Sequence, residues 1–572
     1  MSARALSLNP RLWILGPKRD LSLFVLAPLW IIPLMWLAKT RFDVNVFGAA
    51  ILAIGGIGHH LPGFIRAYTD PVLFRRFRMR FILAPVLFVT TCLIFSTYHL
   101  QSLKLILLLW GVWHGAMQIN GFLRIYDSKV GSISPITAWL DWAMCLLWFG
   151  GGLLHSSIRL IEVFSYFYGA GGWSISPEAF FLFRQTWDVL IVCTTIAFGI
   201  NAWRQTRAGI PPNPVKFLLM ASSFGFWWFA MTYVGDLLVA LVLFEIFHDV
   251  QYNALVWVYN QRRVEQGITA SPAEKFLFQP VAWRFAFYAL LVLGYGYFGM
   301  AANYASTQTQ NLLHAGTGTV HFWTGLFVAS ALLHFYFDGF IWRVREGEFR
   351  QGLGIEKKTA RSVLTSTSVG FPKWLTVSGW KWSLFIIPAF LLGVSEYRGN
   401  AIPLVNQYEN MVNLIPDSWQ VHFVLGLMKK SAGDLDGATD HFEKTVSINP
   451  DFEGAQALLG DIYFHSEKLD LALEHYLKAA ALDSSDYEVQ DHLGTLLLMQ
   501  GRTFEAVPHL LAAAEHEPND ANLSYLVGTA LMQNRKVSEA IPWLQRTLQL
   551  DPNFSGAREK LEQAEKLMAA GG

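Results

Sequence analysis

The stretch Gly55-Gly56-Ile57-Gly58-His59-His60-Leu61-Pro62-Gly63 closes an apolar segment with two adjacent histidines and a Pro-Gly pair that is expected to break a helix. Ionisable side chains are costly at membrane depth and tend to mark function there. The stretch therefore raises two questions. One is whether the segments around it cross a membrane, and the other is whether they bring polar partners to the same level.

The composition indicates a membrane protein with a water-facing extension. Of the 572 residues, 53% are hydrophobic and only 15% are charged, which is too apolar for an ordinary soluble protein. Residues 399–572 hold 12 Lys and Arg against 25 Asp and Glu, whereas the residues before them hold 32 against 18. This asymmetry predicts a lipid-facing transmembrane domain with a basic rim at 1–398, followed by an acidic, solvated region.

Apolar segments of membrane-crossing length recur throughout residues 1–398. A bilayer core needs about 20 apolar residues per helix, and eleven stretches meet or approach that length. We predict an all-α fold in which a polytopic domain of about eleven transmembrane helices precedes an α-solenoid. The stretches are Leu21–Ala38, Val44–His60, Phe81–Tyr98, Leu103–Ile119, Ala138–Leu154, Thr186–Trp203, Val215–Tyr233, Val234–Tyr259, Val281–Ala301, His321–Trp342 and Trp382–Val394.

Lys and Arg are concentrated on one side of this arrangement. They precede the first stretch and follow the second, sixth, eighth and tenth, whereas the intervening loops are nearly free of them. The positive-inside rule then predicts a cytoplasmic N-terminus. Because eleven crossings are an odd number, the region after Val394 is expected on the far side, which is the periplasm if the membrane is a bacterial inner membrane.

A repeat with a period of 34 residues begins after residue 400. Four sets keep the register: Gly426, Gly460, Gly494 and Gly528; Ala438, Ala472, Ala506 and Ala540; Phe442, Tyr476, Leu510 and Leu544; and Pro450, Ser484, Pro518 and Pro552. This pattern resembles the tetratricopeptide repeat, whose signature is a small residue in helix A, an alanine and an aromatic in helix B, and a closing proline. We assign a linker to 399–418, four repeats to 419–554, and a capping helix with a tail to 555–572.

The resemblance implies a groove that binds a protein or peptide partner, although such repeats also serve as an assembly interface. Neither role involves catalysis. The histidines of this region are expected to lie at its solvated surface: His422, His441, His465, His475, His492, His509 and His516.

Five other histidines share a position along the predicted helices. All lie on even-numbered stretches and precede the basic residues that are predicted to be cytoplasmic. His60 is six residues before Arg66, and His248 is fourteen before Arg262. At 1.5 Å per residue, such offsets place the whole set in the cytoplasmic leaflet. The five are His59, His60, His114, His248 and His334.

Carboxylates accompany these histidines. His334 and Asp338 are four residues apart, so they share a helix face, Asp249 follows His248, and Asp141 is a further candidate. Imidazole and carboxylate donors suit Fe, Mn or Zn. We therefore predict a metal site, for which iron is a candidate and di-iron or heme stays open. Its ligands and their carboxylate partners come from His59, His60, His114, His248, Asp249, His334 and Asp338. Each histidine alone is also explained by a hydrogen bond to a neighbouring helix.

Three functions follow from these patterns. The first is a metal-dependent membrane oxidoreductase acting on a lipid or another hydrophobic substrate, which resembles histidine-rich membrane desaturases and hydroxylases in chemistry and depth but lacks their clustered histidine boxes. The second is a membrane acyl- or glycosyltransferase, because Trp113-His114-Gly115 resembles the Trp-His-Gly of membrane-bound O-acyltransferases. In multi-pass glycosyltransferases that share this domain order, acidic catalytic residues lie in the first outer loop, where this chain has only Asp43.

The third function is a non-enzymatic scaffold for assembly or transport that recruits partners through its repeats. The sequence contains no Rossmann or P-loop glycine motif for a nucleotide cofactor. The expected partners are membrane lipids and a protein or peptide, and no nucleic acid is expected.

Overall fold

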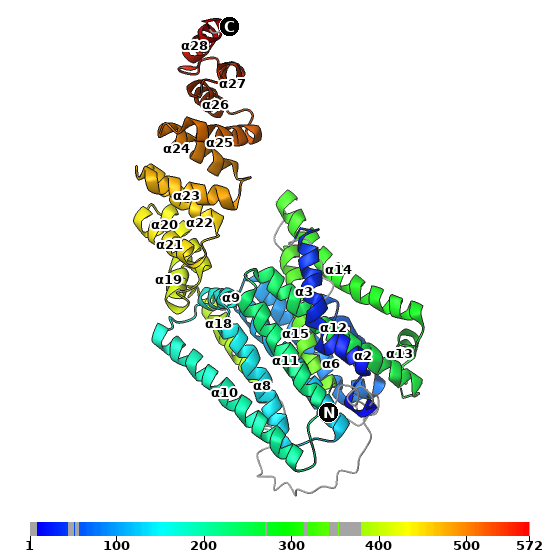
Figure 1. Ribbon diagram of the computed structural model, residues 1–572. Coiled ribbons are helices and arrows are strands. Elements are labelled where there is room, and N and C mark those ends of the chain that lie inside the picture. The colour runs from blue at the N-terminus through cyan, green and yellow to red at the C-terminus, as the bar shows by residue number, and fades with distance from the viewer. Residues whose placement is uncertain are drawn as a thin grey trace. The chain divides into compact units, whose positions relative to one another are not determined.

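The structure is a computed structural model that describes residues 9–43, 48, 51, 56–268, 271–313, 318–342, 353 and 379–570, with the side chains of 300–319, 379–386 and 570 left aside. Within these ranges all regular secondary structure is helical (Figure 1). The chain divides into two compact units, Met1–Asn410 and Met411–Gly572. The division falls inside the predicted linker 399–418, which contains helix α19 (Leu404–Leu414).

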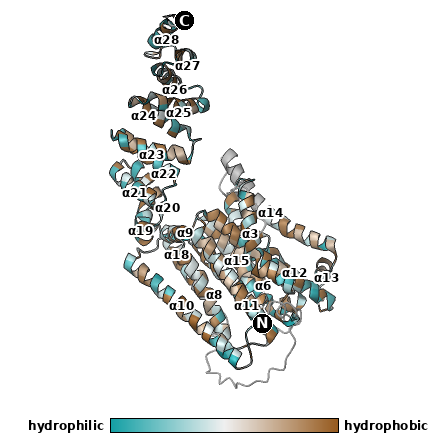
Figure 2. Ribbon diagram, viewed as in Figure 1, coloured by the Kyte–Doolittle hydropathy of each residue, from teal (hydrophilic) through white to brown (hydrophobic). Residues whose placement is uncertain are grey.

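The first unit is a bundle of long helices in which apolar residues predominate (Figure 2). Its shorter elements are η1 (Pro10–Leu12), α2 (Pro17–Asp20), η2 (Leu21–Val25), α5 (His60–Thr69), α9 (Ser157–Gly169), η4 (Phe229–Tyr233) and α13 (Pro272–Leu277). Its longer helices are α3 (Ala27–Lys39), α6 (Pro71–Thr97), α7 (Ser102–Val130), α8 (Pro135–Leu154), α10 (Pro177–Arg207), α11 (Pro214–Trp228), α12 (Leu237–Glu265), α14 (Ala282–Leu313), α15 (Gly318–Ile341) and α18 (Gly379–Tyr397).

Seven spans of the described chain are long and apolar enough to cross a membrane. They are α6, α7, α8, α10, α11 together with η4, α12, and residues Val320–Ile341 of α15. An eighth is added if Pro10–Val25 and Ala27–Lys39, which are bent by 46° at their junction, form one span. The predicted total of about eleven stays a prediction, since most of the stretch Val44–His60 lies outside the described residues.

Five helix starts of this unit share one local signal, a polar capping residue followed by proline. The pairs are Asp70-Pro71, Ser134-Pro135, Ser176-Pro177, Asn213-Pro214 and Ser271-Pro272. The cap side chain accepts a hydrogen bond from a first-turn N–H. Proline is tolerated at the first helical position because an N–H at that position would have no acceptor within the helix. Asp70 accepts from the N–H groups of Val72 and Leu73, and its other oxygen lies 2.9 Å from Arg263 Nη2.

The stretch around Pro62 departs from the prediction. Pro62 and Gly63 do not end a helix but lie in the first turn of α5, which begins at His60 and continues to Thr69. Proline is tolerated there because first-turn N–H groups have no partner within the helix. The histidine doublet therefore opens a helix, with His59 as its capping position.

A buried group of charges joins three helices of the first unit. Lys216 of α11 lies 2.6 Å from carboxylate oxygens of both Asp127 of α7 and Asp141 of α8, and these carboxylates are fully buried. Arg124 Nη1 lies 3.0 Å from Asp141 Oδ2. Two positive and two negative side chains thus balance one another in an apolar setting, where an unpaired charge is costly.

Asp20 fastens the N-terminal segment to this bundle. Its two oxygens accept from the N–H groups of Ile14 and Leu15 at 2.7 Å, and Tyr126 Oη donates to one of them at 2.9 Å. Asn213 adds a donor to the carbonyl of Leu12. The segment is consequently part of the same apolar core as α7 and α11.

The second unit is a solenoid of helix pairs. After α19 it consists of α20 (Trp419–Ser431), α21 (Leu435–Ile448), α22 (Glu453–His465), α23 (Leu469–Leu482), α24 (Tyr487–Met499), α25 (Thr503–His516), α26 (Ala521–Gln533), α27 (Val537–Leu550) and α28 (Ala557–Ala570). One continuous core runs through it from Ala438 to Ala540.

Two of the 34-residue sets meet within each helix pair. A Cβ atom added to Gly460 of α22 would lie 2.6 Å from the ring of Tyr476 in α23. Gly426, Gly494 and Gly528 stand in the same relation to Phe442, Leu510 and Leu544. The glycines are therefore needed because the large residue of helix B packs directly on the backbone of helix A.

Replacing Gly460 with alanine is expected to destabilise the repeat unit by about 1–3 kcal/mol, the usual cost of overpacking. The Tyr476 ring cannot move aside freely, because it is fully buried and its hydroxyl donates to Asp461 at 2.7 Å. Gly454→Ala on the same helix is the matched control, since its Cβ would meet ring atoms only at 3.5 Å or more. Denaturant unfolding should separate the two variants, and equal stability would contradict the packing argument.

The prediction that the histidines of this unit lie at its solvated surface is wrong for His422, which is buried. His441, His475 and His509 are half-buried and also have hydrogen-bond partners. His475 Nδ1 lies 2.7 Å from Gln456 Oε1, and His509 Nδ1 lies 2.6 Å from Gln490 Oε1 in the next pair. In the first pair His422 replaces the glutamine, and its Nδ1 lies 3.1 Å from His441 Nδ1. These contacts join helix B to helix A at the 34-residue period, so the histidines have a structural role.

Candidate metal centre

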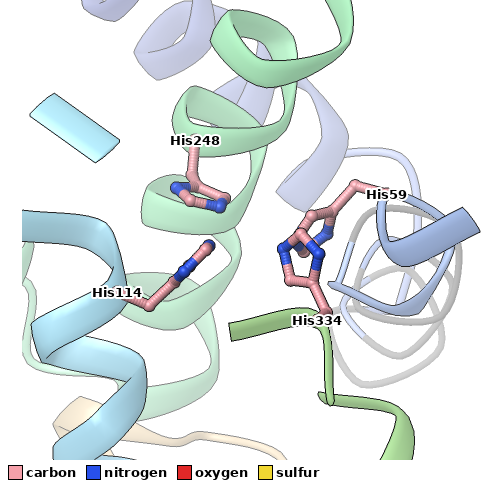
Figure 3. Close-up of side chains that lie close together, drawn as sticks. All are labelled: His59, His114, His248 and His334. Atoms are coloured by element: carbon pink, nitrogen blue, oxygen red, sulfur yellow. The ribbon is translucent and has the colours of Figure 1, made fainter. Parts of the chain in front are cut away.

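Four histidines of the first unit converge from four segments of the chain (Figure 3). His59 precedes the first residue of α5, His114 lies in the middle of α7, His248 lies on α12, and His334 lies on α15. Figure 3 shows the four rings pointing toward a common centre. The structure thus brings together four of the five histidines that the sequence placed at one level.

The spacing of these rings suits a single metal ion. One ring nitrogen from each histidine can be chosen so that all four lie within 4.8 Å of one another. Ring centroids are 4.6 Å apart for His59 and His334, and 5.1 Å apart for His114 and His248. Because metal–imidazole bonds are about 2.0–2.1 Å long, two nitrogens on one ion lie roughly 3–4 Å apart. Small side-chain rotations would complete such a site.

The cluster is buried and incompletely hydrogen-bonded. The exposed fractions are 3% for His59, 8% for His114, 4% for His248 and 0% for His334. His114 Nε2 and both ring nitrogens of His334 form no hydrogen bond with the described residues. A neutral imidazole carries one donor and one acceptor, and leaving a buried polar group unmatched costs about 1–3 kcal/mol. A cation bound to the ring lone pairs would remove much of this cost.

Carboxylates stand beside two of the four rings. Asp249 Oδ1 lies 2.9 Å from His59 Nδ1, and Asp338 Oδ2 lies 3.7 Å from His334 Nε2. Asp338 is itself fixed, since Tyr252 Oη donates to it at 3.2 Å and Trp342 Nε1 at 3.0 Å. Carboxylates placed next to ligating histidines orient the ring and raise its basicity, so both predicted aspartates are well placed for that role.

His60 lies at the edge of the cluster and has a partner of its own. Its ring stacks on that of His334 with centroids 4.7 Å apart, but its Nδ1 lies 2.9 Å from Ser330 Oγ. Ser330 Oγ in turn lies 2.9 Å from Tyr295 Oη. Neighbouring helix residues point about 100° apart, which explains why His59 and His60 do not face the same centre.

Asp141 does not join the histidines. It pairs with Lys216 and Arg124 in the buried charge group described above. Of the remaining histidines of the first unit within the described chain, His99 and His321 have ring centroids 4.2 Å apart, and His155 Nε2 lies 2.9 Å from Asp188 Oδ1. His314 lies outside the described residues.

Sequence reasoning missed two residues of this site. Glu245 of α12 forms a second possible ligand group with His59 and Asp249, and its position three residues before His248 was a signal that could have found it. Gly63 is the other. A Cβ atom there would lie 3.2 Å from Tyr252 Oη and 3.6 Å from His334 Nδ1, so this glycine lets α5 approach the site closely.

The second unit also has a candidate binding surface. A cleft of about 340 Å³ lies along α21, α22 and the turn that follows α22, and its lining includes Asp436, Asp440, Glu443, Tyr463 and Lys468. Tyr463 Oη donates to Glu443. Burial and then this contact raise the pKa of Tyr463 to about 12, so the hydroxyl stays protonated at neutral pH. Three carboxylates against one lysine make the cleft acidic.

Comparison with known protein families finds a match in the second unit. The family model "Tetratricopeptide repeat" matches residues 423–487 and 493–566. The C-terminal region consists of tetratricopeptide repeats. No match is found among curated proteins.

Several solved structures are similar to part of the chain. A structure described as "Crystal structure of MamA protein" is 18% identical, covers 26% of this chain and 81% of its own, and has a TM-score of 0.24. "YrrB: a TPR protein with an unusual peptide-binding site" is 22% identical, covers 32% of this chain and 90% of its own, and has a TM-score of 0.25.

Proposed function

We propose that the first unit is a membrane domain that binds a metal ion between His59, His114, His248 and His334, and that the protein is an oxidoreductase acting on a lipid or another hydrophobic substrate. The observation that carries the proposal is the convergence of four buried imidazoles, two of which have ring nitrogens without hydrogen bonds to the described residues. A purely structural role for histidine would favour paired nitrogens.

The donor set favours iron or a related transition metal. Imidazole suits Fe, Cu and Zn, whereas Mg and Ca prefer oxygen ligands. Heme has less support, because a porphyrin held by two of these imidazoles would need the space that the other two rings occupy. When bound, an iron ion would supply Lewis-acid or one-electron redox chemistry.

The residues around the cluster favour an apolar reactant. Phe335 stacks on His114 with ring centroids 4.5 Å apart, and Phe244 lies 6.0 Å from the His248 ring. Asp249 and Asp338 are placed to orient His59 and His334. The apolar side chains exclude water, and the carboxylates hold the imidazoles in place.

The membrane location and orientation belong to the same proposal. Seven apolar helices of sufficient length support the embedding, and the distribution of Lys and Arg supports a cytoplasmic N-terminus. The tetratricopeptide region would then lie in the periplasm of a bacterium and bind a protein or peptide partner, with the acidic cleft as a candidate surface.

A non-enzymatic scaffold is the second candidate, and the tetratricopeptide region is the observation that favours it. In that case the repeats recruit a partner and the first unit serves as an anchor. An acyl- or glycosyltransferase has less support, because His114 of the Trp-His-Gly tripeptide faces other imidazoles rather than an isolated pocket.

Elemental analysis and an optical spectrum of the full-length protein, purified in detergent without chelators, test the proposal. We expect a first-row transition metal, with iron favoured, at no less than one ion per chain. A protein that contains no such metal and cannot be loaded with one would contradict the metal site and leave the scaffold. A Soret band would show that the metal is held in heme instead.

A further inference from the structure

A second group of ligands lies directly beside the four histidines. The carboxylates of Glu245 and Asp249 and a ring nitrogen of His59 all lie within 4.8 Å of one another. His59 is the member common to both groups. Its Nδ1 lies 2.9 Å from Asp249 Oδ1. Since the two nitrogens of an imidazole point in different directions, His59 can serve one group with each.

The two carboxylates of this second group lie close together. Glu245 and Asp249 are four residues apart on α12, so their side chains stand on one face of the helix. Like charges at that spacing destabilise a helix, and Asp249 is only 8% exposed. The backbone of the chain before His59 also comes close, because a Cβ added to Gly56 would lie 4.0 Å from Glu245 Oε2. Two carboxylates confined in this way form an environment that favours a cation.

One alternative is that Asp249 only orients His59 as a hydrogen-bonding carboxylate, which is common at metal sites. That role involves Asp249 and does not use Glu245, which belongs to the same ligand group. The order Glu245-x-x-His248 on one helix also matches the spacing by which helix bundles supply a carboxylate and an imidazole to paired metal ions.

We propose that His59, Glu245 and Asp249 form a second metal position next to the four-histidine position, so that the first unit binds two metal ions with His59 between them. The inference rests on the proposed metal-binding function. One imidazole and two carboxylates suit a divalent ion such as Fe²⁺ or Mn²⁺. The first position is rich in nitrogen and the second in oxygen, so the two ions would have different surroundings.

Manganese loading of the full-length protein tests this proposal. After incubation with Mn²⁺ and removal of loosely bound ions, we expect two ions per chain in the wild type and one in Glu245→Gln. Glu178→Gln, an exposed position on α10, should keep two. The electron paramagnetic resonance spectrum should change from that of a coupled pair in the wild type to that of an isolated ion in Glu245→Gln.

The outcomes separate the two proposals. One ion in both the wild type and Glu245→Gln overturns the second position and leaves the four-histidine position intact. Two ions in both variants overturn it as well, because the second ion then lies elsewhere. No ion in the wild type overturns both proposals. If Glu245→Gln does not fold, the number of ions in the wild type still tests the second position. His114→Ala is then the comparison, and it should keep only the ion at the second position.

Discussion

Replacing His334 with alanine is expected to remove the metal from the four-histidine position of the purified protein. His334 is fully buried, neither of its ring nitrogens has a hydrogen bond to the described residues, and its ring lies within 5 Å of those of His59 and His114. Loss of a partner that only orients a ligand costs 10–100-fold in metal affinity. Loss of the ligand itself should cost more than that. Competition with a chelator of known affinity measures the change.

The matched control lies on the same helix. His321→Ala removes an imidazole of α15 that contacts His99 and not the cluster, so it should keep the affinity of the wild type. A second readout is the stabilisation that an ion confers, about 2.7 kcal/mol at a concentration 100 times its dissociation constant. Wild type and His321→Ala should unfold at a higher temperature when the ion is added. An equal gain in His334→Ala would show that His334 is not a ligand.

Replacing Lys216 with methionine should strongly destabilise the first unit. The substitution leaves the two fully buried carboxylates of Asp127 and Asp141 with Arg124 as their remaining cation. Removing one partner from a buried charge pair costs about 3–5 kcal/mol, because it leaves an uncompensated charge. Unfolding of the detergent-solubilised protein, followed by temperature or denaturant, measures the loss.

A second substitution tests the cause of that loss. Adding Asp141→Asn to Lys216→Met restores charge balance, since Arg124 then faces Asp127 alone. The double variant should regain much of the lost stability, while Lys39→Met at an exposed position should change little. If Lys216→Met unfolds like the wild type, the charge group does not contribute to stability as described.

Much of the fold follows from periodicity in the sequence. Runs of about 20 apolar residues predicted most of the long helices of the first unit, and the 34-residue spacing predicted the tetratricopeptide repeats. The same spacing pairs Gly460 with Tyr476, but only the structure shows that the two touch. The prediction that Pro62 ends a helix was wrong. Proline interrupts a helix when it lies in the interior but is tolerated in the first turn, and the sequence alone did not show in which turn Pro62 lies.

The candidate site could be predicted in part. Offsets along the predicted helices placed five histidines at one level, and four of them, His59, His114, His248 and His334, lie close together in the structure. Depth says nothing of rotation about each helix axis, and rotation decides that His60 turns toward Ser330 and that Asp141 turns toward Lys216. Glu245 was not predicted as a site residue. It lies within an apolar run, and the prediction considered only the polar residues that follow it, beginning at His248. Contacts between distant segments are set by packing, which one sequence does not specify.

Helix α5 is tied to α12 at both ends. His59 meets Asp249 before its first turn, and Asp70 meets Arg263 after its last. A helix held at both ends has little conformational entropy to lose on ligand binding. The entropic cost of positioning His59 therefore belongs to folding and would not be added to the cost of binding an ion. If the cluster binds an ion as proposed, its affinity would be linked to an ion pair at the opposite end of α5, between Asp70 and Arg263.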